Sequence, residues 1–446
     1  MHFFAKGSIL LEKQLRRYLL PNILAMIGTS CYILADTFFI SLSQGPNGIT
    51  ALNLVLPLYG LIFALGSMIG IGSATRYALG KGINAPDYHL YFSNSIIWTL
   101  LVGAVFVALG VAVPDGVLRL MGADDTISRV GHNYIRIVLC FAPLFMLNFT
   151  CTAFVRNDGA PRIAMAATLL SGLFNILFDY LLMFPLGLGM TGAALATGFS
   201  PVVSMSICLL HYLSPRNTIR LIPTLPSLRR LLSACQLGVV AFVGEMSSGV
   251  TTMVFNFILL HLAGNAAVAA YGIVANIALV GVALFNGISQ GLQPLASACH
   301  GSGNTQGQSR IYRHSMFIGL CVSAVVVAVV VTFAGTLVAV FNSQHSAQLA
   351  DYAIPGLRLY FLGFLFAGAN IVKSGFYSAT GRGRESSILA LCRGVVAIVA
   401  FAFLLSHLLG ITGVWLAFPA AELFTLLLGL VLGRPQGLGA PDPRPA

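Results

Sequence analysis

Five ionisable side chains lie inside long apolar segments of this 446-residue chain, and they are the groups most able to do chemistry: Asp36, Asp179, Glu245, Lys373 and Glu422. A charge at bilayer depth costs about 2.5–3.5 kcal/mol on insertion scales, so each of them is a candidate functional group. The alternative is a position near a helix end, from which the side chain reaches water. That alternative suits Lys373 and Glu422, whereas Asp36 and Asp179 lie several residues inside an apolar run.

The segment NILFD places Asn175 four residues before Asp179. Residues four apart share one face of a helix, so we expect the amide and the carboxylate to point into the same cavity. If Asp36 meets Asp179 there, the two carboxyl groups titrate as a coupled pair and can exchange a proton. Carboxylate and amide oxygens could equally bind an alkali cation. The pattern therefore indicates a site for H⁺ or Na⁺ without separating the two.

Other reactive motifs are missing from the sequence. The eight cysteines are scattered in or beside apolar segments without a CxxC pair, and the nine histidines form no HExxH motif. Neither a Walker A loop nor a GxSxG turn occurs. We therefore expect no enzymatic activity, no metal or other cofactor, and no disulfide framework.

The composition is that of a membrane protein. Hydrophobic residues make up 57% of the chain and charged residues only 8%, whereas a soluble domain has about 25% charged residues. Apolar runs of roughly 20 residues recur from end to end, each long enough to cross the hydrocarbon core as a helix. We predict an all-α membrane protein with about twelve spans. They lie near residues 19–42, 50–78, 91–112, 131–153, 163–184, 189–213, 234–261, 267–297, 315–339, 353–379, 387–408 and 412–432.

Basic residues are distributed unevenly over this topology. Most of the 24 lysines and arginines lie at or near the face that holds the N-terminus, which by the positive-inside rule places both termini in the cytoplasm. The net charge of +11 is thus an orientation signal, and we expect the lipid bilayer and no nucleic acid as a partner. No cleavage motif follows the first apolar run, which predicts a retained helix of a multi-pass protein in the cell inner membrane.

The chain repeats itself at an offset of about 221 residues. LGMTGAALA at 188–196 returns as LGITGVWLA at 409–417. The repeat predicts two parallel-related six-helix bundles: an N-lobe at 1–213 and a C-lobe at 234–433, with a basic cytoplasmic linker at 214–233 and a tail at 434–446. Carriers built this way bind substrate near the midplane and alternate access between the two sides. The second repeat has Val396 and Ala400 in place of Asn175 and Asp179, so the polar pair belongs to the N-lobe alone.

Several motifs in order resemble the multidrug and toxic compound extrusion (MATE) family over nearly the whole chain. They are Pro21, YILADTFFI at 32–40, GIGSAT at 70–75, RNDGAPRIAM at 156–165, NILFD at 175–179 and GMTGAALAT at 189–197. The resemblance implies two lobes around a V-shaped central cavity and a monomeric secondary transporter. Such a protein exports small organic, cationic compounds in exchange for H⁺ or Na⁺.

The prokaryotic branch similar to DinF holds its coupling cation in the N-lobe. The family's positions match Asp36, Asn175, Asp179 and Thr197 here, with Tyr134 as a further member. Pro21 matches the proline at which helix 1 bends when the acid is protonated, and a proline inside a helix is a plausible hinge in its own right.

Another branch of the family places its essential acids in helices 7 and 10, and this sequence departs from it. Glu245 lies about one turn from the matching position, where Ser248 stands, and helix 10 carries Lys373 in place of an acid. Coupling through the C-lobe is therefore not expected. The substrate-cavity candidates are Glu245, which suits a cationic compound, with Ser248, Asn148, Asn370 and Lys373. Lys373 together with Arg393 leaves an anionic or zwitterionic substrate as the less favoured option.

Two other functions are consistent with the fold. A flippase of lipid-linked sugars would need several cavity-facing arginines or lysines for a pyrophosphate, and few are present. A scaffold or sensor that transports nothing would have no use for the unrepeated Asn175 and Asp179. A cation-coupled exporter remains the favoured interpretation.

Overall fold

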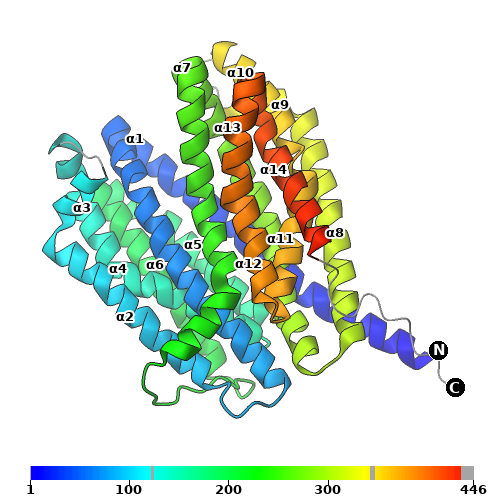
Figure 1. The fold of residues 1–446 in the computed structure, drawn as a ribbon. Coiled ribbons are helices and arrows are strands. Elements are labelled where there is room, and N and C mark those ends of the chain that lie inside the picture. The colour runs from blue at the N-terminus through cyan, green and yellow to red at the C-terminus, as the bar shows by residue number, and fades with distance from the viewer. Residues whose placement is uncertain (1, 122–124, 342–346, 433–446) are drawn as a thin grey trace. The chain divides into compact units, whose positions relative to one another are not determined.

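The computed structural model describes residues 2–121, 125–341 and 347–432, so the expected tail at 434–446 lies outside the described residues. Helices are the only regular secondary structure in those ranges (Figure 1). They are α1 (His2–Gly82), α2 (Leu90–Ala112), α3 (Pro114–Leu120), α4 (Asp125–Asn157), α5 (Pro161–Met183), α6 (Gly189–Tyr212), α7 (Leu228–Gly301), α8 (Thr305–Thr332), α9 (Ala334–Phe341), α10 (Ala347–Phe361), α11 (Phe364–Ala379), α12 (Gly383–Leu391), the π-helix η1 (Cys392–Val396), α13 (Ala397–Leu409) and α14 (Ile411–Val431).

The prediction of about twelve membrane spans is confirmed. Within the described residues, eleven helices are long and apolar enough to cross a bilayer, and α10 with α11, bent by 46°, can form a twelfth. Two long helices hold two spans each: α1 contains Arg17–Ile40 and Val55–Gly82, and α7 contains Leu228–Gly264 and Ala266–Gly301. The break in α7 is at Gly264, whose φ of 72° and ψ of −160° suit only glycine.

Several helices extend beyond the apolar runs that predicted them. Helix α8 begins at Thr305 rather than near 315, and α7 begins at Leu228 rather than near 234. Hydropathy marks the part of a helix that lipid covers, whereas the backbone hydrogen bonds continue into the polar residues beyond it. The first turn of α8 is held by such a residue, since the Asn304 side chain accepts a hydrogen bond from the Gly307 amide.

The chain divides into two compact units, which we call the N-unit (Leu24–Met246) and the C-unit (Met1–Ile23 with Ser247–Ala446). The linker that follows α6 belongs to the N-unit. Helices α1 and α7 are each shared, because the first segment of α1 groups with the C-unit and the first segment of α7 groups with the N-unit. Both changes of unit therefore fall inside a helix. When the repeat offset of about 221 residues is applied, the change in α1 falls within a few residues of the change in α7.

Small residues let the helices of the N-unit approach closely. A Cβ atom at Gly103 of α2 would lie 2.8 Å from the Cα atom of Pro143 in α4, and one at Gly192 of α6 would lie 2.9 Å from the carbonyl carbon of Leu182 in α5. Such contacts are typical of helix packing in membranes. They bring α2 close to α4, and α6 close to α5, the helix that carries Asn175 and Asp179.

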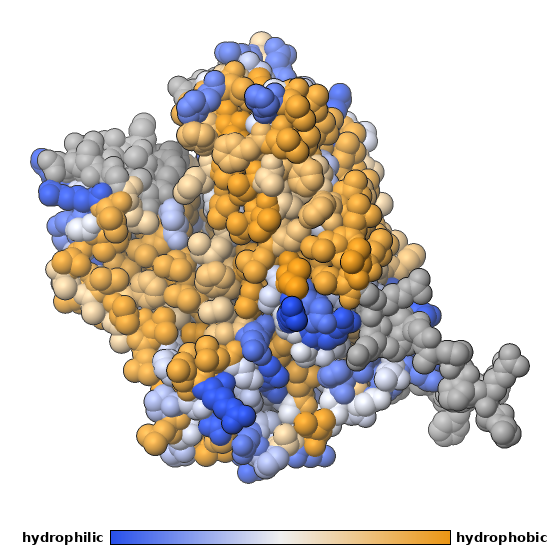
Figure 2. Space-filling view, in the orientation of Figure 1, coloured by the Kyte–Doolittle hydropathy of each residue, from blue (hydrophilic) through white to orange (hydrophobic). Residues whose placement is uncertain are grey.

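Several aromatic side chains stack in the core of the C-unit. Tyr360 and Phe418 stack with their ring centroids 4.3 Å apart, and Phe361 stacks on Phe364 at 4.4 Å. The outer faces of the helices are hydrophobic, and hydrophilic residues gather mainly near helix ends (Figure 2). Exposed leucines and valines along these faces are what a lipid-covered protein requires.

Candidate functional site

Asp36 of α1 and Asp179 of α5 lie side by side in the N-unit. Their carboxyl groups are close enough to interact electrostatically, and Asp179 is fully buried. Close packing of the two helices produces this contact. A Cβ at Gly28 would lie 2.3 Å from Leu169, and one at Gly172 would lie 3.0 Å from the Tyr32 ring. The two acids therefore lie in the same α1–α5 interface as these contacts, further toward the C-terminal end of each segment.

Asn175 lies one turn before Asp179 on α5 and is 1% exposed. Its Nδ2 donates a hydrogen bond of 3.2 Å to Oγ1 of Thr197 on α6. A second α5–α6 bond, from Ser171 Oγ to the carbonyl oxygen of Ser200 at 2.7 Å, fixes the register of the two helices. The structure thus brings together four of the predicted cation-site residues.

Four oxygen atoms of this site are buried without a hydrogen-bond partner among the described residues. They are Asp36 Oδ1, Asn175 Oδ1 and both carboxylate oxygens of Asp179. A buried acceptor without a donor costs free energy, and buried charge costs more. We name these three residues, with Thr197, the acid site. Chemically it can take up a proton between the carboxyl groups or surround a small cation with oxygens.

Three tyrosines surround the acid site. Tyr134 of α4 is 1% exposed and lies close enough to Asp36 and Asp179 to interact with both electrostatically. Tyr59 approaches the same two acids, and Tyr32 approaches Asp36. Tyr32 precedes Asp36 by one helical turn, so spacing alone could have identified it. Tyr59 had no local signal, because only the fold carries it to the acids.

Pro21 lies inside the continuous helix α1, two residues before the C-unit's first segment ends at Ile23. A proline has no amide hydrogen, so the carbonyl of Arg17, four residues earlier, loses its usual donor. Next to it, the side chain of Asn22 donates 2.7 Å to the carbonyl of Tyr18. The helix is thus weakened where its packing passes from one unit to the other.

Glu245 is the exposed acid of α7. It lies deep in the span Leu228–Gly264, belongs to the N-unit and approaches Tyr32. Among the described residues no ion pair includes it. Gly244 and Gly249 have open space where a Cβ would be, so this stretch of α7 is loosely packed. Ser248, also exposed, belongs to the C-unit.

The C-unit surrounds its own buried acid, Glu422 of α14, with donors. Its Oε1 accepts hydrogen bonds from Arg393 Nε at 3.0 Å and Nη2 at 2.7 Å, and its Oε2 accepts one from Asn370 Nδ2 at 2.7 Å. Lys373 of α11 donates to the carbonyl oxygen of Gly429. Glu422 is 1% exposed and Lys373 5%, so the helix-end alternative is wrong for both. Their partners are other helices instead of water.

Of the remaining cavity candidates, Asn370 is buried against α14, and Asn148 lies half-buried on α4 with its Oδ1 unpartnered. No sequence pattern indicated the Arg393–Glu422 pair, whose members are 29 residues apart and on different helices. Arg393 lies in η1, a one-turn π-helix, and such turns rotate the side chains that follow them.

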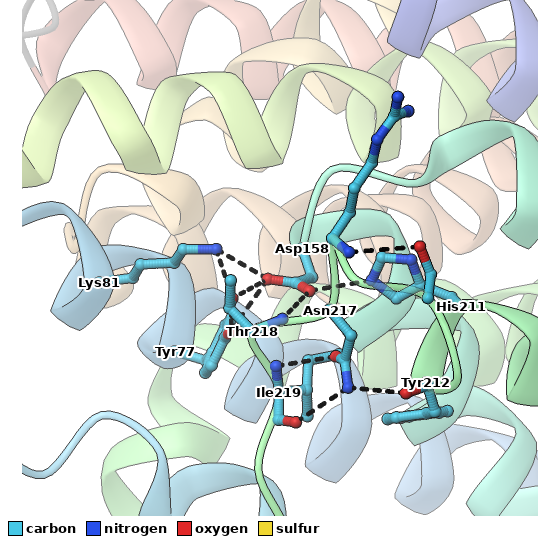
Figure 3. Close-up of polar contacts among 10 residues, drawn as sticks. Tyr77, Lys81, Asp158, His211, Tyr212, Asn217, Thr218 and Ile219 are labelled. Carbon is cyan, nitrogen blue, oxygen red and sulfur yellow. Dashed lines mark hydrogen bonds and ion pairs between the residues drawn. The ribbon is translucent and has the colours of Figure 1, made fainter.

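A further carboxylate of the N-unit, Asp158, was not predicted as a site residue (Figure 3). It lies in the RNDGAPR segment, and its side chain accepts hydrogen bonds from Lys81 Nζ at 2.7 Å, His211 Nε2 at 2.9 Å and the backbone amide of Thr218 at 2.8 Å. Burial opposes ionisation, but these donors together hold the pKa of the Asp158 carboxyl below its usual value. Asp158 is thus a satisfied anion, unlike the acid site.

Within the residues described, no three or more His, Cys, Asp or Glu side chains come close enough to hold a metal ion. The acid site offers only two carboxylates, which suits a proton or a weakly bound monovalent cation better than a resident metal.

Comparisons with known proteins agree with this architecture. The profile of the family described as MatE matches residues 21–181 and 241–404. The multidrug export protein MepA of Staphylococcus saprophyticus is 28% identical over 97% of this chain and 95% of its own length, and MepA of Staphylococcus aureus is 26% identical over the same shares. Among solved structures, an outward-facing multidrug resistance MATE transporter superposes with a TM-score of 0.88 at 25% identity, over 95% of both chains. A MOP superfamily transporter from Pyrococcus furiosus superposes with a TM-score of 0.87 at 25% identity, over 96% of this chain and 97% of its own.

Proposed function

This chain belongs to the MATE family of transporters, and on that premise we propose that it exports organic cations from the cytoplasm in exchange for H⁺ that enters through the acid site. The observation that carries the proposal is the proximity of Asp36 and Asp179, two carboxyl groups that together have three buried oxygens without a hydrogen-bond partner among the described residues. The relatives named as multidrug export proteins cover almost the whole chain and support the same activity.

The geometry of the acids favours H⁺ over Na⁺ as the coupling ion. Two carboxyl groups can share a hydrogen bond only when one of them is protonated. Their titration is then coupled, so loading and unloading one proton changes the contact between α1 and α5. A sodium ion would need further oxygen ligands, which Asn175 Oδ1 and water could add, and this remains the second outcome of the test.

Glu245 supports a cationic substrate. It is an exposed carboxylate at membrane depth, without a basic partner in the described part of the chain, on a loosely packed stretch of α7. A cation bound there would neutralise a charge that is costly to leave uncompensated. Arg393 and Lys373 of the C-unit are already engaged with Glu422 and Gly429, which argues against a flippase that would use them on a pyrophosphate.

Alternating access would couple the two events in a monomer. Protonation of the acid site from outside would change the packing of α1 on α5, and the weakened helix at Pro21 would bend in response. Substrate is then released outward, and loss of the proton to the cytoplasm resets the protein. A ligand drives such a cycle only through its different affinities for the two states.

Transport by purified protein in liposomes tests the proposal, with a pH gradient or a sodium gradient imposed one at a time. We expect a fluorescent organic cation to move with the pH gradient. Asp36→Asn should abolish this movement, and Asp351→Asn, which alters an exposed acid of α10, should leave it intact. Movement with the sodium gradient alone would replace H⁺ by Na⁺, and full activity of Asp36→Asn would remove the acid site from the mechanism.

A further inference from the structure

The linker between α6 and α7 is fixed along its length to the N-unit. Near its start, Thr218 is held by Asp158. Further on, the backbone amide of Ile222 donates 2.8 Å to Ser93 Oγ, and the amide of Ser227 donates 2.8 Å to Asn94 Oδ1. Because the anchors are spread over the whole segment, the side chains between them are presented in a defined arrangement.

These anchors also set the height of the linker relative to the bilayer. Ser93 and Asn94 lie about one turn into α2, which is a membrane span of 23 residues. Such a helix is about 35 Å long, only slightly more than the roughly 30 Å hydrocarbon core. The first turn of α2 therefore lies at the boundary between hydrocarbon and headgroups, and the linker segment 219–227 lies there with it.

Two leucines and two arginines are exposed between residues 216 and 225 of the linker. Leu221 is 69% exposed and Leu225 is 84% exposed, and Arg216 and Arg220 are exposed as well. Leucines fixed in water are unfavourable, whereas leucines at the boundary can enter the acyl chains. Hydrophobic and hydrophilic residues lie side by side at the end of the N-unit where α7 begins (Figure 2).

The charge of this surface is positive and largely uncompensated. Residues 213–232 contain four arginines and no Asp or Glu. Arg230 approaches Asp87 at 3.8 Å. For Arg216, Arg220 and Arg229 no ion pair occurs among the described residues, and Asp158 nearby is already satisfied.

We propose that Arg216, Arg220 and Arg229, with Leu221 and Leu225, form a binding surface for anionic phospholipids of the cytoplasmic leaflet. The guanidinium groups would bind headgroup phosphates, which they match in geometry, while the leucines enter the hydrocarbon. A soluble acidic protein is the less suitable partner, because the segment lies at the height of the headgroups. The proposal rests on the orientation assumed for the exporter, with the linker on the cytoplasmic side.

Native mass spectrometry of the detergent-purified protein, with added phosphatidylglycerol or phosphatidylcholine, tests this surface. We expect wild type to retain severalfold more phosphatidylglycerol than phosphatidylcholine. The triple variant Arg216→Gln/Arg220→Gln/Arg229→Gln should lose most of that preference. The matched control Arg310→Gln/Arg313→Gln on α8 should keep it.

Added salt should also lower phosphatidylglycerol binding by wild type, because exposed charges are screened. This measurement, with the single variant Arg220→Gln, keeps the test decisive if the triple variant folds poorly. Equal phosphatidylglycerol binding by wild type and the triple variant, or equal loss in the α8 control, would overturn the proposal. Asp36→Asn should bind phosphatidylglycerol normally while transporting nothing, so failure of the lipid surface and failure of the exporter mechanism are distinguishable.

Discussion

Each unit of this protein buries acid at membrane depth, but the two units compensate that charge differently. In the C-unit, Glu422 has its own cation, Arg393, and an amide donor from Asn370. In the N-unit, no ion pair among the described residues includes Asp36 or Asp179, and the two acids lie beside each other. A built-in counter-ion makes a carboxylate part of the structure, whereas two uncompensated carboxyl groups leave room for a cation that comes and goes. The difference teaches that position in the membrane alone does not identify a site for a coupling ion.

Asp179→Asn should separate function from stability most sharply. We expect transport driven by a pH gradient to fall more than a hundredfold, while the melting temperature of the purified protein stays the same or rises, because the variant removes an uncompensated charge. Dye transport in liposomes and thermal unfolding in detergent check both parts. A large loss of stability would show that the acid is structural and that the two units are alike.

Arg393→Met should have the opposite signature. It leaves Glu422 buried without a cation, and breaking such a pair costs about 3–5 kcal/mol. We expect a strongly lowered melting temperature and little folded protein. The double variant Arg393→Met/Glu422→Gln should recover most of the loss. If the double variant is as unstable as the single one, the pair is not what stabilises this region.

Asp158→Asn tests a compensated acid inside the N-unit itself. Because its pKa is held below the usual value in the folded protein, the Asp158 network stabilises at neutral pH and this contribution is lost as pH falls through the folded pKa. Removing the charged acceptor should cost about 1–3 kcal/mol at pH 7. Melting temperatures at pH 7 and at pH 2.5, well below the usual pKa of an aspartate, should differ less in the variant than in wild type. An unchanged difference would mean that Asp158 contributes nothing to the pH dependence of stability.

Thr197→Val should produce the smallest effect. It removes the acceptor of the 3.2 Å bond from Asn175, a loss of about 1 kcal/mol or less for a neutral pair. We expect transport to weaken severalfold with its apparent pH optimum displaced, since Asn175 is then free to turn away from Asp179. Thr224→Val, in the linker, is the matched control. Identical pH profiles for Thr197→Val and wild type would show that the Asn175–Thr197 hydrogen bond does not support the acid site.

Hydropathy and spacing were enough to predict the helices and one face of the site. Asn175 and Asp179 are one turn apart on any helix, so their shared face followed from the sequence. The approach of Asp36 depends on Gly28 and Gly172, whose close contacts only the packed structure reveals.

The C-unit was less predictable because its polar contacts join distant residues. Arg393 and Glu422 meet across two helices, and the π-helix at Cys392–Val396 breaks the regular spacing on which a sequence pattern depends. The change of unit within α1 and α7 could not be predicted from the sequence either, since hydropathy does not show which helices a hydrophobic segment packs against.

The first segment of α1 has a consequence for biosynthesis. Leu15 and Leu19 are buried in the C-unit core, and a Cβ at Gly287 would lie 2.5 Å from the Cα atom of Ile23. The ribosome adds about 5–20 residues per second, so this segment waits on the order of 10–50 s for its partner to be made. This segment is therefore made long before its neighbour in α7, and truncated chains that end after α6 leave it without these native neighbours.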